Sequence, residues 1–128
     1  MKITLPGSIR SKKNSKIPTI IGGKEKPRRA IILPSNAYKK WEKEALPEIK
    51  AQYPHTEPII SDVHVKAVAY IRGVLPDLSG MTESVGDCLE KAEVIANDKQ
   101  IKSWDGSRVL RDKDNPRTEV EIKPYGEG

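Results

Sequence analysis

The sequence predicts an α+β protein: a single small domain in which two main helices pack on one mixed β-sheet. Three patterns indicate this class, namely a long alternating apolar segment at 63–71, two segments with helical spacing on either side of it, and short strand-like segments near both ends. A chain of 128 residues suffices for one modest core. We therefore expect one domain over residues 1–128, with a mobile basic loop at 8–16 and a mobile tail at 124–128.

The chain before the first helix is predicted to be extended. Lys2–Leu5 alternates polar and apolar residues, as a short strand does. Residues 8–16 are too polar to be buried and are expected to form an exposed basic loop. Ile17–Ile21 and Ala30–Leu33 are short apolar segments separated by glycines and charged residues, which favours a β-hairpin with a basic tip.

The first helix is predicted to begin directly after Pro34, where Ser35 and Asn36 are suitable caps. Aromatic and apolar residues then recur at helical spacing among charged ones. Pro47 lacks the N–H that a helix interior requires, so we expect the helix to break or restart there and to end by Tyr53.

The central strand is predicted at Val63–Ile71, with alternate residues on one buried face. A second helix is predicted over about Gly80–Ala92, with Cys88 on its buried stripe. The segments Ile101–Leu110 and Thr118–Ile122 are expected to form a terminal antiparallel pair joined by a charged turn.

Composition bears on where the protein works. No apolar segment approaches the roughly 20 residues that span a bilayer, and the first residues lack the apolar core of a signal peptide. Cys88 is the single cysteine and cannot form an internal disulfide, which is typical of a reducing compartment. We expect a cytoplasmic protein with no membrane partner.

Charge divides the chain into a basic front and an acidic segment. The net charge is +5, but residues 1–43 hold twelve Lys or Arg against two Glu, a balance of +10. Residues 77–98 hold six acids against Lys91, a balance of −5. A basic surface beside gathered carboxylates is typical of nucleic-acid binding combined with metal chemistry. Charge alone favours a solvated basic face equally well.

The acidic segment contains residues that neighbouring elements could bring together. Asp77 follows the central strand, Asp87 lies about two turns along the helix, and Asp98 lies in the loop that returns to the sheet. Mg²⁺ prefers carboxylate oxygens and keeps several waters, so two or three such residues suffice. An acidic helix face in solvent has the same spacing, and the pattern by itself leaves both interpretations open.

Two other residues have plainer interpretations. A lone histidine on a strand face, such as His64, is more often exposed or hydrogen-bonded than a ligand. Trp104 is expected to belong to the core rather than to wedge into DNA. We therefore leave both outside the predicted site.

Blocks of sequence along nearly the whole chain add a family resemblance. They are LPGSIRSKKNSK at 5–16, LPSNAYKKWEKE at 33–44, the segments PDLS, GDCL and VIANDKQI within 76–101, and NPRTEVEI at 115–122. In this order they resemble the RusA family of Holliday junction resolvases, which are common in prophages. The resemblance implies a RusA-like fold, a homodimer, and a Mg²⁺-dependent endonuclease that cuts four-way and other branched DNA in recombination and repair, with Mn²⁺ as a plausible substitute.

Site residues follow from the same resemblance. Asp77 and Asp98 match two carboxylates of the family's metal motif, and Asp87 matches its helix aspartate. Ser79 stands where a further aspartate is expected, and Glu83 stands where the best-known members have a catalytic lysine. We expect Glu83 to supply the missing carboxylate, one helical turn after Ser79, and Ser79 to cap the helix.

Phosphate contacts are expected from basic residues near the first strand and beside the metal motif. The predicted DNA-binding residues are Arg10, Lys12, Lys13, Lys16 and Lys99. Two alternatives remain: a non-catalytic protein that binds junctions through a degenerate metal site, and a small basic protein that binds RNA or another protein.

Overall fold

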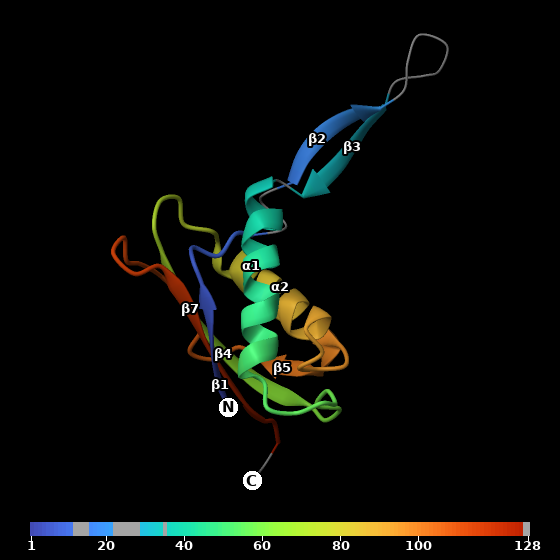
Figure 1. The fold of residues 1–128 in the computed structure, drawn as a ribbon, viewed down its shortest axis with the longest axis vertical. Helices are drawn as coiled ribbons and strands as arrows, with labels where there is room; N and C mark the ends of the chain where they lie inside the picture. The colour runs from blue at the N-terminus through green and yellow to red at the C-terminus, as the bar shows by residue number, and fades with distance from the viewer. Residues whose placement is uncertain (12–15, 22–28, 35, 127–128) are drawn as a thin grey trace.

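The computed structural model describes residues 1–11, 16–21, 29–34 and 36–126 (Figure 1). Its main sheet is mixed, with β4 (Val63–Ile71) in the interior. On one side β4 pairs antiparallel with β7 (Arg117–Pro124), which in turn pairs antiparallel with β1 (Lys2–Pro6). On its other side β4 pairs parallel with β5 (Ile101–Ser103) and β6 (Arg108–Arg111). The predicted central position of β4 is confirmed.

Helices α1 (Asn36–Gln52) and α2 (Leu78–Lys91) cover one face of this sheet (Figure 1). Alternate residues of β4 from Val63 to Ile71 are buried on that face, whereas Lys66 on the other face is exposed. The buried stripe of α2 contains Met81, Val85 and Leu89 together with Cys88, whose position on it was predicted. The α+β class, with a mixed sheet and two main helices, is therefore confirmed. Among the described residues, no helix is long and apolar enough to cross a membrane.

Helix α1 continues through Pro47, so the predicted break there is wrong. Proline removes the N–H that would bond the carbonyl of Lys43. Both residues are exposed, and water can satisfy that carbonyl. Ala45 and Ile49, on either side of the proline, are fully buried and hold both halves of the helix in the core.

The predicted pairing of Ile101–Leu110 with Thr118–Ile122 is also wrong. The first segment is divided into β5 and β6 on one edge of β4, while β7 lies on the opposite edge. Gly106, with φ of +86°, turns the chain between β5 and β6. Alternation identified these residues as strands, but it does not state which edge of β4 each strand will join.

The predicted hairpin of the front segment is confirmed. Strands β2 (Lys16–Ile21) and β3 (Arg29–Pro34) pair antiparallel, with Ile17 opposite Leu33. In Figure 1 this hairpin extends from the end of the domain where α1 begins. Its predicted basic tip lies outside the described residues.

Candidate metal and DNA site

Asp77 begins helix α2. Its backbone is extended (φ −72°, ψ 162°), and its Oδ1 accepts a hydrogen bond from the N–H of Gly80 at 2.8 Å. The prediction that Ser79 caps this helix is therefore wrong. Ser79 lies inside the helix, and its Oγ donates to Oδ2 of Asp77 at 3.5 Å. A carboxylate is favoured as the cap because it also interacts with the positive end of the helix dipole.

A cleft of about 160 Å³ lies between α2 and the segment that returns to the sheet. Its lining comprises Ser79, Thr82, Glu83 and Gly86 from α2, and Asp98, Ile101 and Trp104 from the returning segment. Glu83 and Asp98 are both exposed. Within the described part of the chain, neither carboxylate has a hydrogen-bond or ion-pair partner. Two uncompensated carboxylates therefore share one cleft.

These donors suit Mg²⁺, which is commonly held by one or two carboxylates and retains several waters. Within the described residues, no three His, Cys, Asp or Glu side chains gather closely enough to enclose a metal by themselves. Asp77 adjoins the cleft through its hydrogen bond with Ser79. The geometry fits an open cation site in which water and phosphate oxygens complete the coordination, rather than a closed structural site.

Asp87 occupies a different environment from Glu83 and Asp98. Its Oδ2 lies 3.2 Å from Lys91 Nζ and accepts a hydrogen bond from the Tyr38 hydroxyl at 3.2 Å. Glu42 of α1 joins the same group, accepting from Tyr38 at 2.7 Å and pairing with Lys91 at 2.8 Å. This group, the α1–α2 clamp, consists of Tyr38, Glu42, Asp87 and Lys91. Asp87 does not line the cleft, although it lies on the same helix.

The clamp shifts the titration of two of its members. Burial, reinforced by the hydrogen bond to Glu42, raises the pKa of the Tyr38 hydroxyl. The hydrogen bond to Glu42, together with the Asp87 carboxylate, raises the pKa of the Lys91 ammonium. Tyr38 therefore stays a neutral donor and Lys91 stays charged, so the clamp offers one cation and one hydroxyl donor to its two carboxylates.

The segment before the basic loop packs against α2. Ile9 and Ser11 are buried, so the predicted exposure of the whole 8–16 segment is wrong at these positions. Ser84 Oγ donates to the carbonyl of Arg10 at 2.7 Å. A Cβ on Gly80 would overlap both Ser11 and Asp77, so only glycine at this position lets the segment lie against the beginning of α2. Alternation between buried neighbours leaves Arg10 exposed.

The other predicted DNA contacts are described to different extents. Lys99 is exposed and follows Asp98 directly in the returning turn. Lys16 begins β2, and Lys12 and Lys13 lie outside the described residues. Lys99 thus lies next to Asp98 in the chain, and the backbone of Arg10 lies on α2, the helix that carries Glu83.

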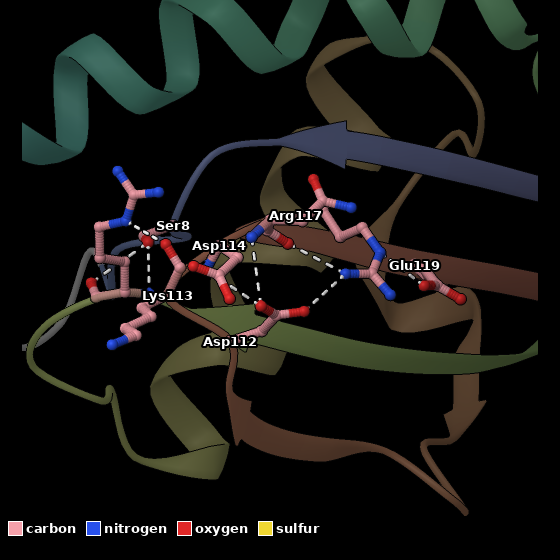
Figure 2. Close-up of polar contacts among 8 residues, drawn as sticks. Ser8, Asp112, Lys113, Asp114, Arg117 and Glu119 are labelled. Atoms are coloured by element: carbon pink, nitrogen blue, oxygen red, sulfur yellow. Dashed lines mark hydrogen bonds and ion pairs between the residues drawn. The ribbon is translucent and has the colours of Figure 1, made fainter.

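A larger depression of about 310 Å³ lies on the sheet face away from the helices, but its charges are internally balanced. Glu119 accepts a hydrogen bond from Arg117 at 2.8 Å, and Glu121 pairs with Lys123 at 2.8 Å. Figure 2 shows Arg117 bridging Glu119 and Asp112, with 3.3 Å to Asp112. The pair between Arg117 and Asp112 closes the 112–117 turn, and we take the smaller cleft as the candidate site.

Comparison with known proteins gives the family of the chain. A family model described as endodeoxyribonuclease RusA matches residues 6–123, which is nearly the whole chain. The chain belongs to the RusA endodeoxyribonuclease family. The resemblance expected from the sequence is confirmed, and with it a DNA endonuclease of the Holliday junction resolvase type. No curated protein matches this RusA-family chain.

Sequence patterns missed several residues that build the site of this RusA-family protein. Thr82, Gly86 and Trp104 line the cleft, and Trp104 is half-buried against the core at the same time. Thr82 and Gly86 carried no chemical signal in the sequence, and Trp104 was assigned to the core alone. His64 is hydrogen-bonded to Ser103 Oγ at 2.7 Å, consistent with leaving it outside the site.

Proposed function

We propose that this protein is a Mg²⁺-dependent endodeoxyribonuclease that resolves Holliday junctions and related branched DNA by paired, symmetric nicks. One observation carries the proposal. Glu83 and Asp98 present uncompensated carboxylates to the same cleft, on a chain whose family cuts DNA. Both carboxylates are exposed and have no cation partner among the described residues, so both can accept a divalent cation as a counterion.

The proposed ligands are Asp98 and Glu83. Asp77 accepts a hydrogen bond from Ser79, which lines the cleft, and is proposed as a neighbouring carboxylate of the site. A bound Mg²⁺ would stabilise charge on the scissile phosphate and lower the pKa of an attacking water. Mn²⁺ accepts the same oxygen ligands and should substitute. Asp87, the fourth carboxylate predicted from the sequence, is assigned to the α1–α2 clamp, where it holds α2 and therefore the cleft in place.

DNA would be held mainly through its phosphates. Arg10, on the segment that lies against α2, and Lys99, next to Asp98, are both exposed, and Lys12, Lys13 and Lys16 follow Arg10 in sequence. Each phosphate that such a side chain neutralises releases counterions, so binding should weaken steeply with added salt. The segment 9–11 is anchored on α2, so Arg10 is presented from a fixed backbone.

Two sites per particle are needed for paired nicks. We therefore propose a homodimer, because a two-fold axis matches the near-symmetry of a four-way junction and directs one site to each of two opposing strands. We further propose that the protein acts in the bacterial cytoplasm, from a phage or prophage gene, in DNA recombination and repair.

The test compares a labelled synthetic four-way junction with linear duplex, each with and without Mg²⁺. The proposal expects metal-dependent, symmetric nicking of the junction alone, retained with Mn²⁺ and lost in Asp98→Asn. Size-exclusion chromatography with light scattering should give twice the 14.3 kDa chain mass. Equal cutting of linear duplex would contradict junction specificity, and a monomer that still makes paired nicks would contradict the dimer.

Ser79 supports a second candidate, a junction-binding relative with little turnover. It lies on the cleft at the position where the family resemblance led us to expect a carboxylate. This candidate predicts tight, salt-sensitive junction binding with no nicking at any Mg²⁺ or Mn²⁺ concentration. If it holds, Ser79→Asp should restore nicking, whereas in an active enzyme the same change should only lower the metal concentration required.

A further inference from the structure

Asp98 lies on a short turn whose conformation depends on hydrogen bonds from other residues. The turn η1 (Asp98–Gln100) is a single 3₁₀ turn, which has little stability without outside support. Asn97 precedes it as cap, with its Oδ1 accepting from the N–H of Lys99 at 2.8 Å. In the described chain the Asp98 carboxylate has no protein partner, so its direction depends on how the backbone of this turn is held.

Gln100 holds the turn from one side. It is buried, and its Oε1 accepts from the N–H of Asn97 at 2.8 Å. Its amide nitrogen donates to the carbonyls of Ile59 and Ser61, both at 2.8 Å. The side chain therefore joins the turn to the segment that leads into the central strand β4.

Glu90 holds the turn from the other side. Its Oε1 accepts a hydrogen bond from the backbone N–H of Asp98 at 2.8 Å. Glu90 belongs to α2, the helix that also carries Glu83. The bond thus ties Asp98 to the same rigid element as Glu83. Charge-assisted hydrogen bonds of this kind are stronger than neutral ones.

We propose that Glu90 and Gln100 are positioning residues for Asp98, which fix the separation of the two cleft carboxylates. The inference rests on the proposed metal site. Groups that orient a metal ligand without touching the metal typically change metal affinity about 10- to 100-fold when they are removed. Neither residue lines the cleft, so both act through the backbone of the turn.

Metal binding can be followed without catalysis. Trp104 lines the same cleft and should sensitise the luminescence of bound Tb³⁺, a hard cation that takes the same oxygen ligands as Mg²⁺. Titration of the full chain with Tb³⁺, followed by displacement with Mg²⁺, gives both affinities. Trp104→Phe should remove most of the signal and thereby show that it arises in the cleft.

The decisive comparison is between two replacements of Glu90. Glu90→Ala removes the acceptor and should weaken Tb³⁺ and Mg²⁺ binding by about tenfold or more. Glu90→Gln keeps an acceptor oxygen for the Asp98 N–H but removes the charge, and should weaken binding by less than about fivefold. Glu44→Ala, which removes an exposed carboxylate from α1, should leave the affinity unchanged.

Gln100→Glu supplies an independent test. It keeps the acceptor for Asn97 but loses both donors to Ile59 and Ser61 at neutral pH, and should also weaken metal binding about tenfold. Circular dichroism would show whether this variant folds, and the Glu90 variants provide the test if it does not.

Equal losses of metal affinity in Glu90→Ala and Glu90→Gln would overturn the positioning role of Glu90, since its charge would then be what matters. Wild-type affinity in Glu90→Ala would also overturn it. Absence of Mg²⁺-displaceable Tb³⁺ binding in the wild type would overturn the metal site itself.

Discussion

Helix α2 places carboxylates in two regions that differ in whether the protein compensates their charge. In the α1–α2 clamp, Asp87 lies 3.2 Å from Lys91 and accepts from Tyr38, so its charge is compensated by the protein. In the cleft, Glu83 lines the same space as Asp98, and no described residue compensates either of them. Acidic residues spaced four apart on one helix thus join two helices in one case and remain without a protein partner, among the described residues, in the other.

Removal of both cleft carboxylates should have the largest effect. In Glu83→Gln/Asp98→Asn, junction cleavage should fall by at least about 10³-fold, because the stabilisation of phosphate charge is lost. Junction affinity measured by gel shift in Ca²⁺ or without metal should stay within about threefold, since phosphate contacts by Arg10 and the neighbouring lysines persist. Asp62→Asn, an exposed acid outside the cleft, is the control. Substantial residual cleavage would place the metal elsewhere.

The single change Glu83→Gln should have a smaller effect. We expect cleavage to fall about 10- to 100-fold at low Mg²⁺ and to recover partly at high Mg²⁺, because Asp98 still offers one carboxylate. The measurement is the nicking rate against Mg²⁺ concentration. Unchanged rates at every concentration would show that Glu83 does not replace the carboxylate expected at Ser79.

Asp87→Asn should distinguish the role of the clamp in stability from the role of the cleft in cleavage. Asparagine keeps an acceptor oxygen for Tyr38 but loses the ion pair between the partly buried Asp87 and Lys91, so the free energy of unfolding should fall by roughly 0.5 kcal/mol in denaturant titrations. Cleavage at saturating Mg²⁺ should remain within about threefold of wild type, because Asp87 does not line the cleft. A hundredfold loss of cleavage with unchanged stability would indicate that Asp87 belongs to the metal site, as the family resemblance implies.

Alkaline pH should loosen the α1–α2 clamp. The pKa values of Tyr38 and Lys91 are raised in the folded protein, so their stabilisation is present in full below the unfolded values of about 10 and is lost as pH rises toward the folded ones. The free energy of unfolding should therefore decline above about pH 10. Tyr38→Phe should make this decline shallower, and an identical slope would show that Tyr38 does not contribute.

Local patterns predicted most of the elements but not all of their partners. Alternation at Val63–Ile71 and the apolar stripe of α2 identified a central strand and a buried helix face, because burial on one side imposes these periods. Pro47 was expected to break α1, yet burial of its neighbours outweighs one missing hydrogen bond. The edge of β4 that each later strand joins depends on the whole sheet, and alternation could not reveal it.

The candidate site divides in the same way. Composition and motif order indicated a basic, carboxylate-bearing nuclease, and the family match to residues 6–123 agrees. The choice of cap was decided by three-dimensional geometry, since Asp77 reaches the Gly80 N–H and Ser79 does not serve there. The hydrogen bond from the backbone N–H of Asp98 to Glu90 could not be predicted from the sequence either. Both residues are acids, and their side-chain charges alone would suggest repulsion.

The sequence by itself determined the class of the protein: the periods of its residues predict an α+β fold, and the order of its motifs resembles the RusA endonucleases, with acids near Asp77 and Asp98. Only the tertiary structure decided which acids act together. Helix α2 turns Glu83 toward the returning segment and Asp87 toward α1, so that one meets Asp98 and the other meets Lys91. A carboxylate's role depends on the charges packed against it, and those come from elements distant in the chain.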